Sequence, residues 1–204
     1  GIGGGGFALV WDGSNSSAYD FREKAPSSAH KRMFLNDRNN PKKYRFENTV
    51  LEKASLNGHL AAGVPGFVAG WLQIHQEKGA LPLEVLLEPA IKLAEQGVVV
   101  YDSLAKAISY RKEVLGAFRG SKDVYFLGTK PLKIGDLLKQ KDLANTLRII
   151  SKKKGQSFYQ GEIAKKIDKE MNGKGLITLS DMKSYVVKKR IPLKSSYKGY
   201  KIIT

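Results

Sequence analysis

Residues 7–26 read FALVWDGSNSSAYDFREKAP, and this stretch gives the clearest indication of the fold. Its first part, FALVWDG at residues 7–13, is apolar and aromatic and closes on Asp-Gly, a dipeptide that favours a tight turn. A polar Asn/Ser stretch follows, and a second extended run begins at Ser17 and ends at Phe21. The pattern predicts a β-hairpin whose second strand leads directly into DFREKAP, residues 20–26.

A run of glycines precedes this hairpin, because the sequence opens GIGGGGF. The spacing Gly1-x-Gly3-x-x-Gly6 formally matches the dinucleotide-binding fingerprint. That fingerprint needs its glycines after a strand and at the start of a helix, whereas these glycines lead into a strand. We therefore reject a dinucleotide site and expect closely packed backbone, either a tight loop or a crowded sheet edge.

Beyond Pro26 the hydrophobic spacing becomes helical. It predicts helices over 27–35 with Ser27 as cap, 65–78, 83–96, from about Tyr101 with Asp102 or Ser103 as cap, 142–153, 161–171 and 179–185. Residues 124–127 are expected to form a strand or turn, and the end of the chain an extended stretch. The polar residues 36–58 are expected to form a variable or mobile loop region.

Several amphipathic helices with so few strands indicate an α/β assembly that is short of strands. The glycine-rich opening and the close on GYKIIT, residues 199–204, which reads as an unfinished strand, are what we expect of a segment of a longer protein.

The composition excludes several classes of protein. With 42% hydrophobic residues among 204, the chain is too apolar for a disordered polyelectrolyte. The absence of cysteine excludes disulfides, zinc ribbons, iron–sulfur clusters and a thiol nucleophile. No run approaches the roughly 20 apolar residues of a transmembrane helix, so no membrane-spanning segment is expected in this chain.

The net charge of +16 raises the question of an anionic partner. The basic residues gather in short groups, at 152–154, 165–166 and 188–190, at the expected ends or outer faces of helices. No aromatic-rich basic motif accompanies them, so a solvated surface is favoured over specific nucleic-acid binding.

The histidines do not predict a metal centre, since His30, His59 and His75 lie in different segments without ligand spacing. The residues that do suggest chemistry are Asp20-Phe21-Arg22-Glu23, where an arginine stands between two carboxylates at a strand end. A planar guanidinium can hold a carboxylate through two parallel hydrogen bonds, and the two acids can fix its rotamer. From spacing alone, a structural arginine bound only to those acids is the somewhat better interpretation.

Several motifs in order resemble the large subunit of gamma-glutamyltransferases, also called glutathione hydrolases. They are GIGGGGF, DFREKAP, HLAAGVPGFVAG at residues 59–70, EPAIKLA at residues 88–94 and FYQG at residues 158–161. The resemblance implies an N-terminal-nucleophile hydrolase, whose fold is a four-layer αββα sandwich. Residues 1–204 would then form part of the large subunit of a single two-chain domain.

The family is made as a precursor that cuts itself, and the new N-terminal threonine of the small subunit is the nucleophile. The resemblance therefore implies no catalytic residue, metal or cofactor in this chain, and the small subunit as its partner. Arg22 matches the arginine that binds the α-carboxylate of the γ-glutamyl donor, with Asp20 and Glu23 as residues that position it. This match reverses the preference for a structural arginine.

The implied donor is glutathione or a related γ-glutamyl compound, the acceptor is water, an amino acid or a peptide, and the location is periplasmic or secreted. Two alternatives remain. One is a related acylase or capsule transpeptidase of the same superfamily, and the other is a non-catalytic basic domain that binds polyanions. Lys24, Lys139 and the basic run 188–190 stand where the family more often has neutral or acidic residues.

Overall fold

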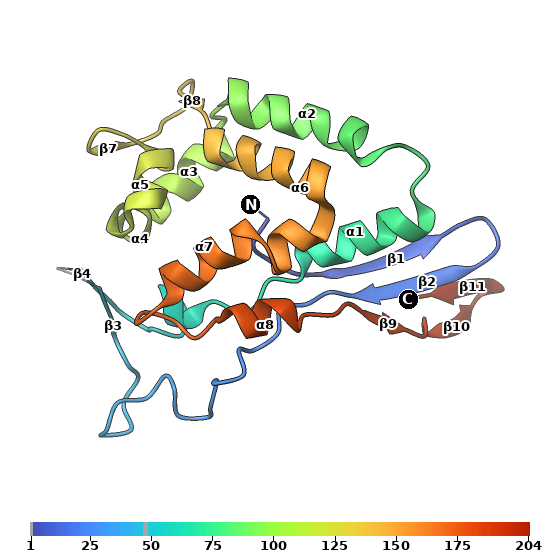
Figure 1. The fold of residues 1–204 in the computed structure, drawn as a ribbon, viewed down its shortest axis with the longest axis horizontal. Coiled ribbons are helices and arrows are strands. Elements are labelled where there is room, and N and C mark those ends of the chain that lie inside the picture. Colours follow the sequence, from blue (N-terminus) through green and yellow to red (C-terminus); the bar gives the residue numbers. More distant parts are fainter. Residues whose placement is uncertain (1, 47–48) are drawn as a thin grey trace. The chain divides into compact units, whose positions relative to one another are not determined.

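The computed structural model describes residues 2–46 and 49–204 (Figure 1). The chain divides into two compact units, each with a buried core of its own. The first unit comprises Gly1–Ala29, Ala62–Pro82 and Lys153–Thr204, and the second comprises His30–Ala61 and Leu83–Lys152. Within the described residues, no helix is long and apolar enough to cross a membrane.

A three-stranded antiparallel sheet forms the centre of the first unit, in the order β1-β2-β9 (Figure 1). Strands β1 (Phe7–Trp11) and β2 (Ser16–Asp20) pair from Phe7↔Asp20 to Trp11↔Ser16, which confirms the predicted hairpin. Strand β9 (Lys188–Arg190) adds to the other edge of β2, with Asp20 opposite Lys188. The end of β2 is therefore held between strands from both ends of the chain.

The two faces of this sheet differ. On one face Ala8, Val10 and Tyr19 pack with Ala69 and Ile74 of helix α1 (Phe67–Lys78). On the other face three alternate side chains of β1 are exposed, with 69%, 45% and 58% of their surface accessible: Phe7, Leu9 and Trp11. Because strand side chains alternate in direction, one face of the hairpin is packed, and the exposed apolar side chains of β1 share the other face with Asp20, which is paired with Phe7.

Helix α1 starts two residues after the predicted position and ends where the sequence predicts it. The backbone N–H groups of Gly66 and Phe67 both donate to the carbonyl of Gly4, at 2.9 and 2.8 Å. These bonds satisfy two of the N–H groups that the first turn of a helix leaves without an intrahelical partner, and Gly66 is the N-cap residue. Gly79 ends it by donating its N–H to the carbonyl of His75.

The three predicted helices near the end of the chain are confirmed, although some of them begin or end at other residues than predicted. Helix α6 (Lys141–Tyr159) extends beyond the predicted 142–153 and contains non-helical backbone at Lys154, with φ 53° and ψ −153°. Helix α7 (Glu162–Met171) matches its prediction, whereas α8 (Leu179–Lys183) ends earlier than predicted. The expected extended end forms the hairpin of β10 (Lys194–Tyr197) and β11 (Tyr200–Ile203).

The predicted helix over 27–35 is wrong, because this stretch forms successive turns. Ser27 does not cap a helix; its N–H donates to the carboxylate of Asp181 at 2.8 Å, and its side chain hydrogen-bonds to the same carboxylate. The backbone hydrogen bonds that follow, such as that from the N–H of Ala29 to the carbonyl of Pro26, each close one turn and are not continued as a helix.

Further along, within 36–58, β3 (Tyr44–Phe46) pairs with β4 (Thr49–Leu51). Glu47 and Asn48 lie outside the described residues.

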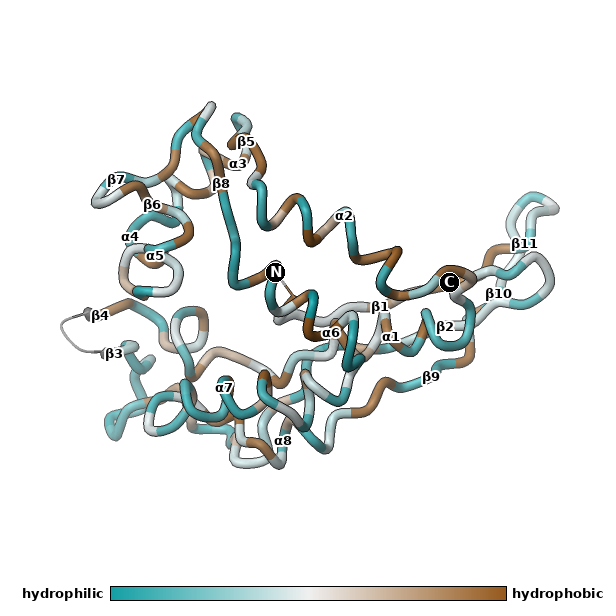
Figure 2. The backbone as a smooth tube through the Cα atoms, turned by 45° about the horizontal axis from the view of Figure 1, so that its top comes forward, coloured by the Kyte–Doolittle hydropathy of each residue, from teal (hydrophilic) through white to brown (hydrophobic). Residues whose placement is uncertain are grey.

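The second unit is mainly helical. It contains the 3₁₀ helix η1 (His59–Ala61), α2 (Leu83–Gln96), β5 (Val98–Val99), α3 (Asp102–Tyr110), α4 (Lys112–Ala117), α5 (Arg119–Tyr125), β6 (Phe126–Leu127), β7 (Lys130–Pro131) and β8 (Leu137–Leu138). The prediction over 83–96 is confirmed residue for residue, and hydrophobic and hydrophilic positions alternate along α2 in Figure 2. One buried cluster of the second unit consists of Val100, Ile108, Leu132 and Leu138. The residue that caps α3 is Tyr101 rather than Asp102 or Ser103.

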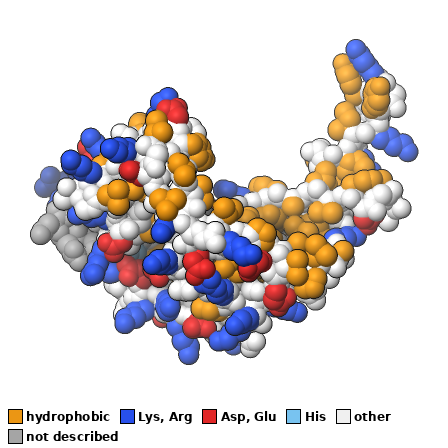
Figure 3. Space-filling view, turned by 90° about the horizontal axis from the view of Figure 1, so that it is seen from above, with side chains coloured by type: hydrophobic (Ala, Val, Ile, Leu, Met, Phe, Trp, Pro, Cys, Tyr) orange, Lys and Arg blue, Asp and Glu red, His pale blue; other side chains and the backbone are white. Residues whose placement is uncertain are grey.

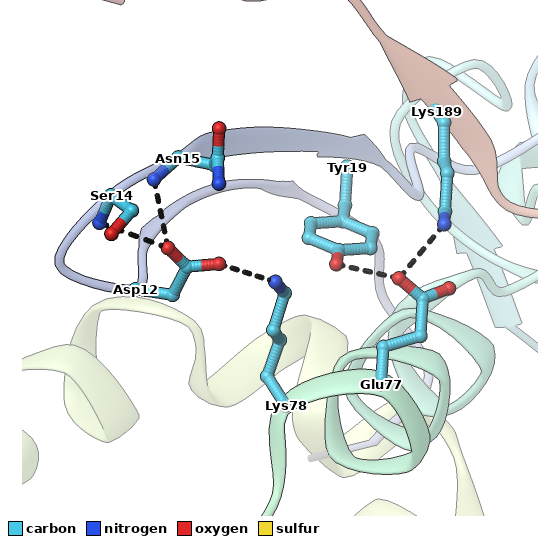
Figure 4. A network of polar contacts seen from close by, with 7 residues as sticks. All are labelled: Asp12, Ser14, Asn15, Tyr19, Glu77, Lys78 and Lys189. Carbon is cyan, nitrogen blue, oxygen red and sulfur yellow. Dashed lines mark hydrogen bonds and ion pairs between the residues drawn. The ribbon is translucent and has the colours of Figure 1, made fainter.

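A polar network joins the sheet of the first unit to the end of α1 (Figure 4). The carboxylate of Glu77 accepts hydrogen bonds from the Tyr19 hydroxyl and from Lys189, both at 2.8 Å. The next residue, Lys78, pairs with Asp12 beside the hairpin turn at 2.7 Å. The network thus ties both the turn and the β2–β9 edge to one helix terminus.

We predict that Glu77 gives the protein a pH-dependent part of its stability. Hydrogen bonds from Lys189, Gln73 and Tyr19 lower the pKa of Glu77 from 4.5 to about 2. A carboxyl whose pKa is depressed in the folded state stabilises that state fully above its unfolded pKa and loses the effect as the pH falls. Glu77→Gln should therefore lower the free energy of unfolding at pH 7 by about 1 kcal/mol.

Urea unfolding at several pH values measures this effect. The difference between wild type and Glu77→Gln should shrink as the pH falls from 4.5 toward 2. A difference that stays constant over that range would contradict the assignment. Glu113→Gln, on α4 of the other unit, is the control and should show little change.

Candidate functional site

The segment that carries Arg22 is held by backbone hydrogen bonds on both sides. Before it, Phe21 and Gly6 exchange a pair of bonds, at 2.9 and 3.2 Å. After it, Lys24 and Val64 exchange another pair, at 3.1 and 2.8 Å. Arg22 therefore lies between two anchored residues, and its Cα position is tightly restricted.

Glycines allow the close approach of chains that this arrangement requires. A Cβ added at Gly5 would lie 2.5 Å from the carbonyl oxygen of Phe21 and 2.6 Å from the nitrogen of Glu23. One added at Gly66 would overlap the Phe21 carbonyl and the Tyr185 hydroxyl, and one at Gly70 would overlap the Phe21 ring. The closely packed backbone that we expected for the glycine run is confirmed at Gly5.

The side chain of Arg22 projects from this rigid backbone. Its guanidinium pairs with Glu23, with 3.1 Å between Nη1 and Oε2, and 62% of the side chain remains accessible. Asp20, the other expected partner, accepts a hydrogen bond from the backbone N–H of Arg22 at 3.2 Å. Its carboxylate also accepts two bonds from Arg190, at 2.7 and 3.0 Å. Glu23 therefore contacts the guanidinium, and Asp20 contacts the backbone.

The charge of Asp20 is balanced inside the sheet. The hydrogen bonds from Arg190 lower the pKa of Asp20, and the charge of Lys188 lowers it further. Because Ala18↔Arg190 and Asp20↔Lys188 are paired positions, both cations lie on the same face of the sheet as this carboxylate. Asp20 is thus engaged by Arg190, and the largely exposed guanidinium of Arg22 has Glu23 as its ion-pair partner.

A pocket of about 520 Å³ opens beside Arg22. It is lined by residues 20 and 22–24 and by residues 184–186 and 188. The pocket therefore presents the cations Arg22, Lys24 and Lys188, while one of its acids, Asp20, is neutralised by Arg190. Such an arrangement suits a small ligand that carries a carboxylate, because an arginine fork binds both oxygens of that group.

Two features of this site had no signal in the sequence. The hydroxyl of Tyr185 donates to the carbonyl of Arg22 at 2.8 Å, and Arg190 binds Asp20. Both partners lie far from Arg22 along the chain, so neither spacing nor periodicity points to them. Only the pairing of β9 with β2 brings Arg190 to Asp20.

The three histidines lie in different surroundings, His75 in the first unit and His30 and His59 in the second. His59 shares a 2.7 Å hydrogen bond with the Tyr44 hydroxyl, and His75 bonds to the carbonyl of Leu81 at 2.8 Å. His30 is exposed in the turns that follow Ala29. The part of the chain that the structure describes holds no group of three metal-ligating side chains.

The basic residues are distributed rather than gathered at one place. Figure 3 shows Lys and Arg side chains over much of the visible face, with Asp and Glu side chains between many of them. Several lysines pair with an acid four residues earlier: Lys92 with Glu88 on α2, Lys106 with Asp102 on α3, and Lys174, just after α7, with Glu170. This pattern is typical of solvated helix surfaces.

The family model described as gamma-glutamyltranspeptidase matches residues 1–204. The chain belongs to the gamma-glutamyltranspeptidase family. The glutathione hydrolase proenzyme of Escherichia coli strain K12 is 41% identical over 205 residues, and the match covers 98% of this chain and 34% of that protein. The chain thus spans about a third of the length of the curated relatives that it matches.

Solved structures of the family have the same fold. The crystal structure of Helicobacter pylori gamma-glutamyltranspeptidase aligns with a TM-score of 0.90 and 43% identity, covering 100% of this chain and 56% of that one. The Bacillus anthracis transpeptidase CapD aligns with a TM-score of 0.76 and 33% identity, covering 100% of this chain and 60% of that one. The chain is therefore a helix-rich α/β part of a gamma-glutamyltranspeptidase-family protein.

We predict that Gly70→Ala destabilises the protein although it lies in a helix. Alanine normally favours a helix over glycine by about 1 kcal/mol, but its Cβ at residue 70 would overlap the buried ring of Phe21. Forcing an extra carbon into packed surroundings costs about 1–3 kcal/mol, so a net loss is expected. Chemical unfolding of the full-length protein measures it.

Gly120→Ala is the matched control, because residue 120 is also helical and a Cβ there meets nothing within 4 Å. This variant should be neutral or slightly stabilising. The explanation fails if both variants shift the unfolding midpoint in the same direction and by the same amount.

Proposed function

We propose that this chain supplies donor recognition to an enzyme that cleaves γ-glutamyl bonds, as in glutathione. The enzyme would transfer the γ-glutamyl group to water, an amino acid or a peptide. The observation that carries the proposal is the exposed guanidinium of Arg22 on a backbone anchored at Phe21 and Lys24. In this role Arg22 binds the α-carboxylate of the donor, and Asp20 and Glu23 position it.

The energetics of the Arg22–Glu23 pair support this role. An ion pair this exposed contributes about 0–1 kcal/mol to stability, so little is lost when the guanidinium turns toward a ligand. A bidentate bond to a bound carboxylate, formed away from bulk water, is worth more than the exposed pair. The resting pair therefore keeps Arg22 in place without competing strongly with the substrate.

The open face of β1 supports a second chain as partner. Phe7, Leu9 and Trp11 form a row of exposed apolar side chains that a folded protein normally covers. We propose that a sheet of the small subunit covers this row and completes the αββα sandwich. Phe7 is paired with Asp20, so the covered face would border the pocket of Arg22. Residues 1–204 would then be part of a single two-chain domain, with 36–58 as its variable region.

The proposed reaction takes place at the N-terminal threonine of that small subunit. Its hydroxyl attacks the γ-carbonyl of the donor while a base, such as the free α-amine, removes the proton. An oxyanion hole stabilises the tetrahedral intermediate, the base gives its proton to the leaving nitrogen, and the C–N bond breaks to release the amine and give an acyl-enzyme. Water or an amine then accepts the γ-glutamyl group. The role of Arg22 is to hold the donor so that its γ-carbonyl meets the nucleophile.

A different acyl donor is the main alternative within the same superfamily, as in an acylase or a capsule transpeptidase. The distributed, partly paired basic residues give less support to a polyanion-binding domain, because such a domain needs its cations on one face. A periplasmic or secreted location belongs to the proposal.

We predict that Arg22→Lys in the full-length precursor raises KM for a γ-glutamyl anilide by about ten-fold or more. Lysine keeps the charge but loses the two-pronged hydrogen bond to the carboxylate. Self-cleavage and thermal stability should change little, because the guanidinium makes only an exposed contact. Steady-state kinetics with the anilide, together with gel analysis of the two subunits, measures both.

Arg119→Lys is the matched control, since the side chain of Arg119 is 95% accessible and lies on α5. It should leave KM unchanged. Unchanged kinetics in Arg22→Lys with normal self-cleavage would refute the proposed role. Tight, salt-sensitive heparin binding by a precursor without hydrolytic activity would favour the polyanion-binding alternative.

A further inference from the structure

Tyr185 contacts the substrate-binding segment directly through a single hydrogen bond. Its hydroxyl donates to the main-chain carbonyl of Arg22 at 2.8 Å, and its ring lies beside the buried residues Tyr19, Phe21 and Val187. It also lines the pocket that opens beside Arg22. The bond therefore acts on the backbone from which the guanidinium projects.

The ring of Tyr185 is itself held in place. It stacks on Tyr159 with 5.7 Å between the ring centroids and 16° between the planes. Tyr159 is buried, donates its hydroxyl to the carbonyl of Pro65 and accepts the N–H of Ala69. The two tyrosines thus connect the start of α1 to the carbonyl of Arg22 through one rigid stack.

The surroundings of the Tyr185 hydroxyl leave space for it and keep it protonated. A side chain at residue 66 would overlap that hydroxyl, so the glycine there leaves the space that the phenol occupies. Burial, together with the negative charges of Asp20 and Glu23, raises the pKa of Tyr185 to about 12. The hydroxyl accordingly remains a protonated donor throughout the neutral and mildly alkaline range.

We propose that Tyr185 is a positioning residue for donor recognition: it fixes the Arg22 carbonyl and thereby the origin and direction of the guanidinium. The inference rests on the proposed role of Arg22 in binding the donor carboxylate. The bonds of Phe21 to Gly6 and of Lys24 to Val64 remain without it, so the segment still folds. What is lost is the orientation of the peptide unit between those anchors, on which a bidentate contact depends.

The test uses Tyr185→Phe in the full-length precursor, because this change removes the hydroxyl and keeps the stacked ring. KM for the γ-glutamyl anilide should rise about two- to ten-fold, the range expected for losing one such hydrogen bond. The inhibition constant of glutamate should rise by a similar factor, while kcat changes by less than about two-fold. Tyr110→Phe is the control, since Tyr110 is 86% exposed on α3, and it should behave as wild type.

A double-mutant cycle separates positioning through Arg22 from a general structural effect. In an Arg22→Lys background, Tyr185→Phe should raise KM by a clearly smaller factor than in wild type, since residues that act as one unit are not additive. Equal factors in both backgrounds, an unchanged KM, or a variant that no longer self-cleaves would each overturn the inference.

The same experiment distinguishes the two proposals. If the wild-type precursor does not hydrolyse the anilide, or if Arg22→Lys leaves KM unchanged, the proposed function fails and the inference falls with it. If Arg22→Lys raises KM and Tyr185→Phe does not, only the positioning role of Tyr185 is refuted.

Discussion

Two exchanged pairs of backbone hydrogen bonds, Phe21 with Gly6 and Lys24 with Val64, set the geometry of the first unit. They force the glycine run, the end of β2 and the segment before α1 into direct contact. That contact leaves no room for side chains at Gly5 or Gly66. The glycines and the placement of Arg22 therefore follow from one constraint on the main chain.

This constraint fixes the backbone of Arg22 but leaves its guanidinium free to turn. The backbone of Arg22 is bound at its N–H by Asp20 and at its carbonyl by Tyr185, whereas its guanidinium makes an exposed ion pair with Glu23. A fixed backbone reduces the conformational entropy lost when a ligand binds, and the weak contact with Glu23 leaves the guanidinium available to that ligand. Recognition of a small carboxylate benefits from both properties.

The sequence predicts those parts of the structure that local physics determines. The hairpin from Phe7 to Asp20 follows from its turn residues, and α2 follows from hydrophobic spacing that ends at Gly97. The predicted helix over 27–35 is wrong, and Ser27, its expected cap, is bound through its N–H and its side chain to Asp181, a partner distant in sequence. Arg22 was a candidate from its neighbours alone, but its contact with Tyr185 and the pairing of Asp20 with Arg190 arise only from tertiary structure.

The most direct test of the central claim is a crystal structure of the full enzyme with bound glutamate, in which the contacts of the α-carboxylate are measured. We expect both of its oxygens within about 2.7–2.9 Å of the guanidinium nitrogens of Arg22, with the Tyr185 hydroxyl still on the Arg22 carbonyl. A glutamate whose α-carboxylate is held by other residues, with Arg22 still paired to Glu23, would contradict the assignment of this chain to donor recognition.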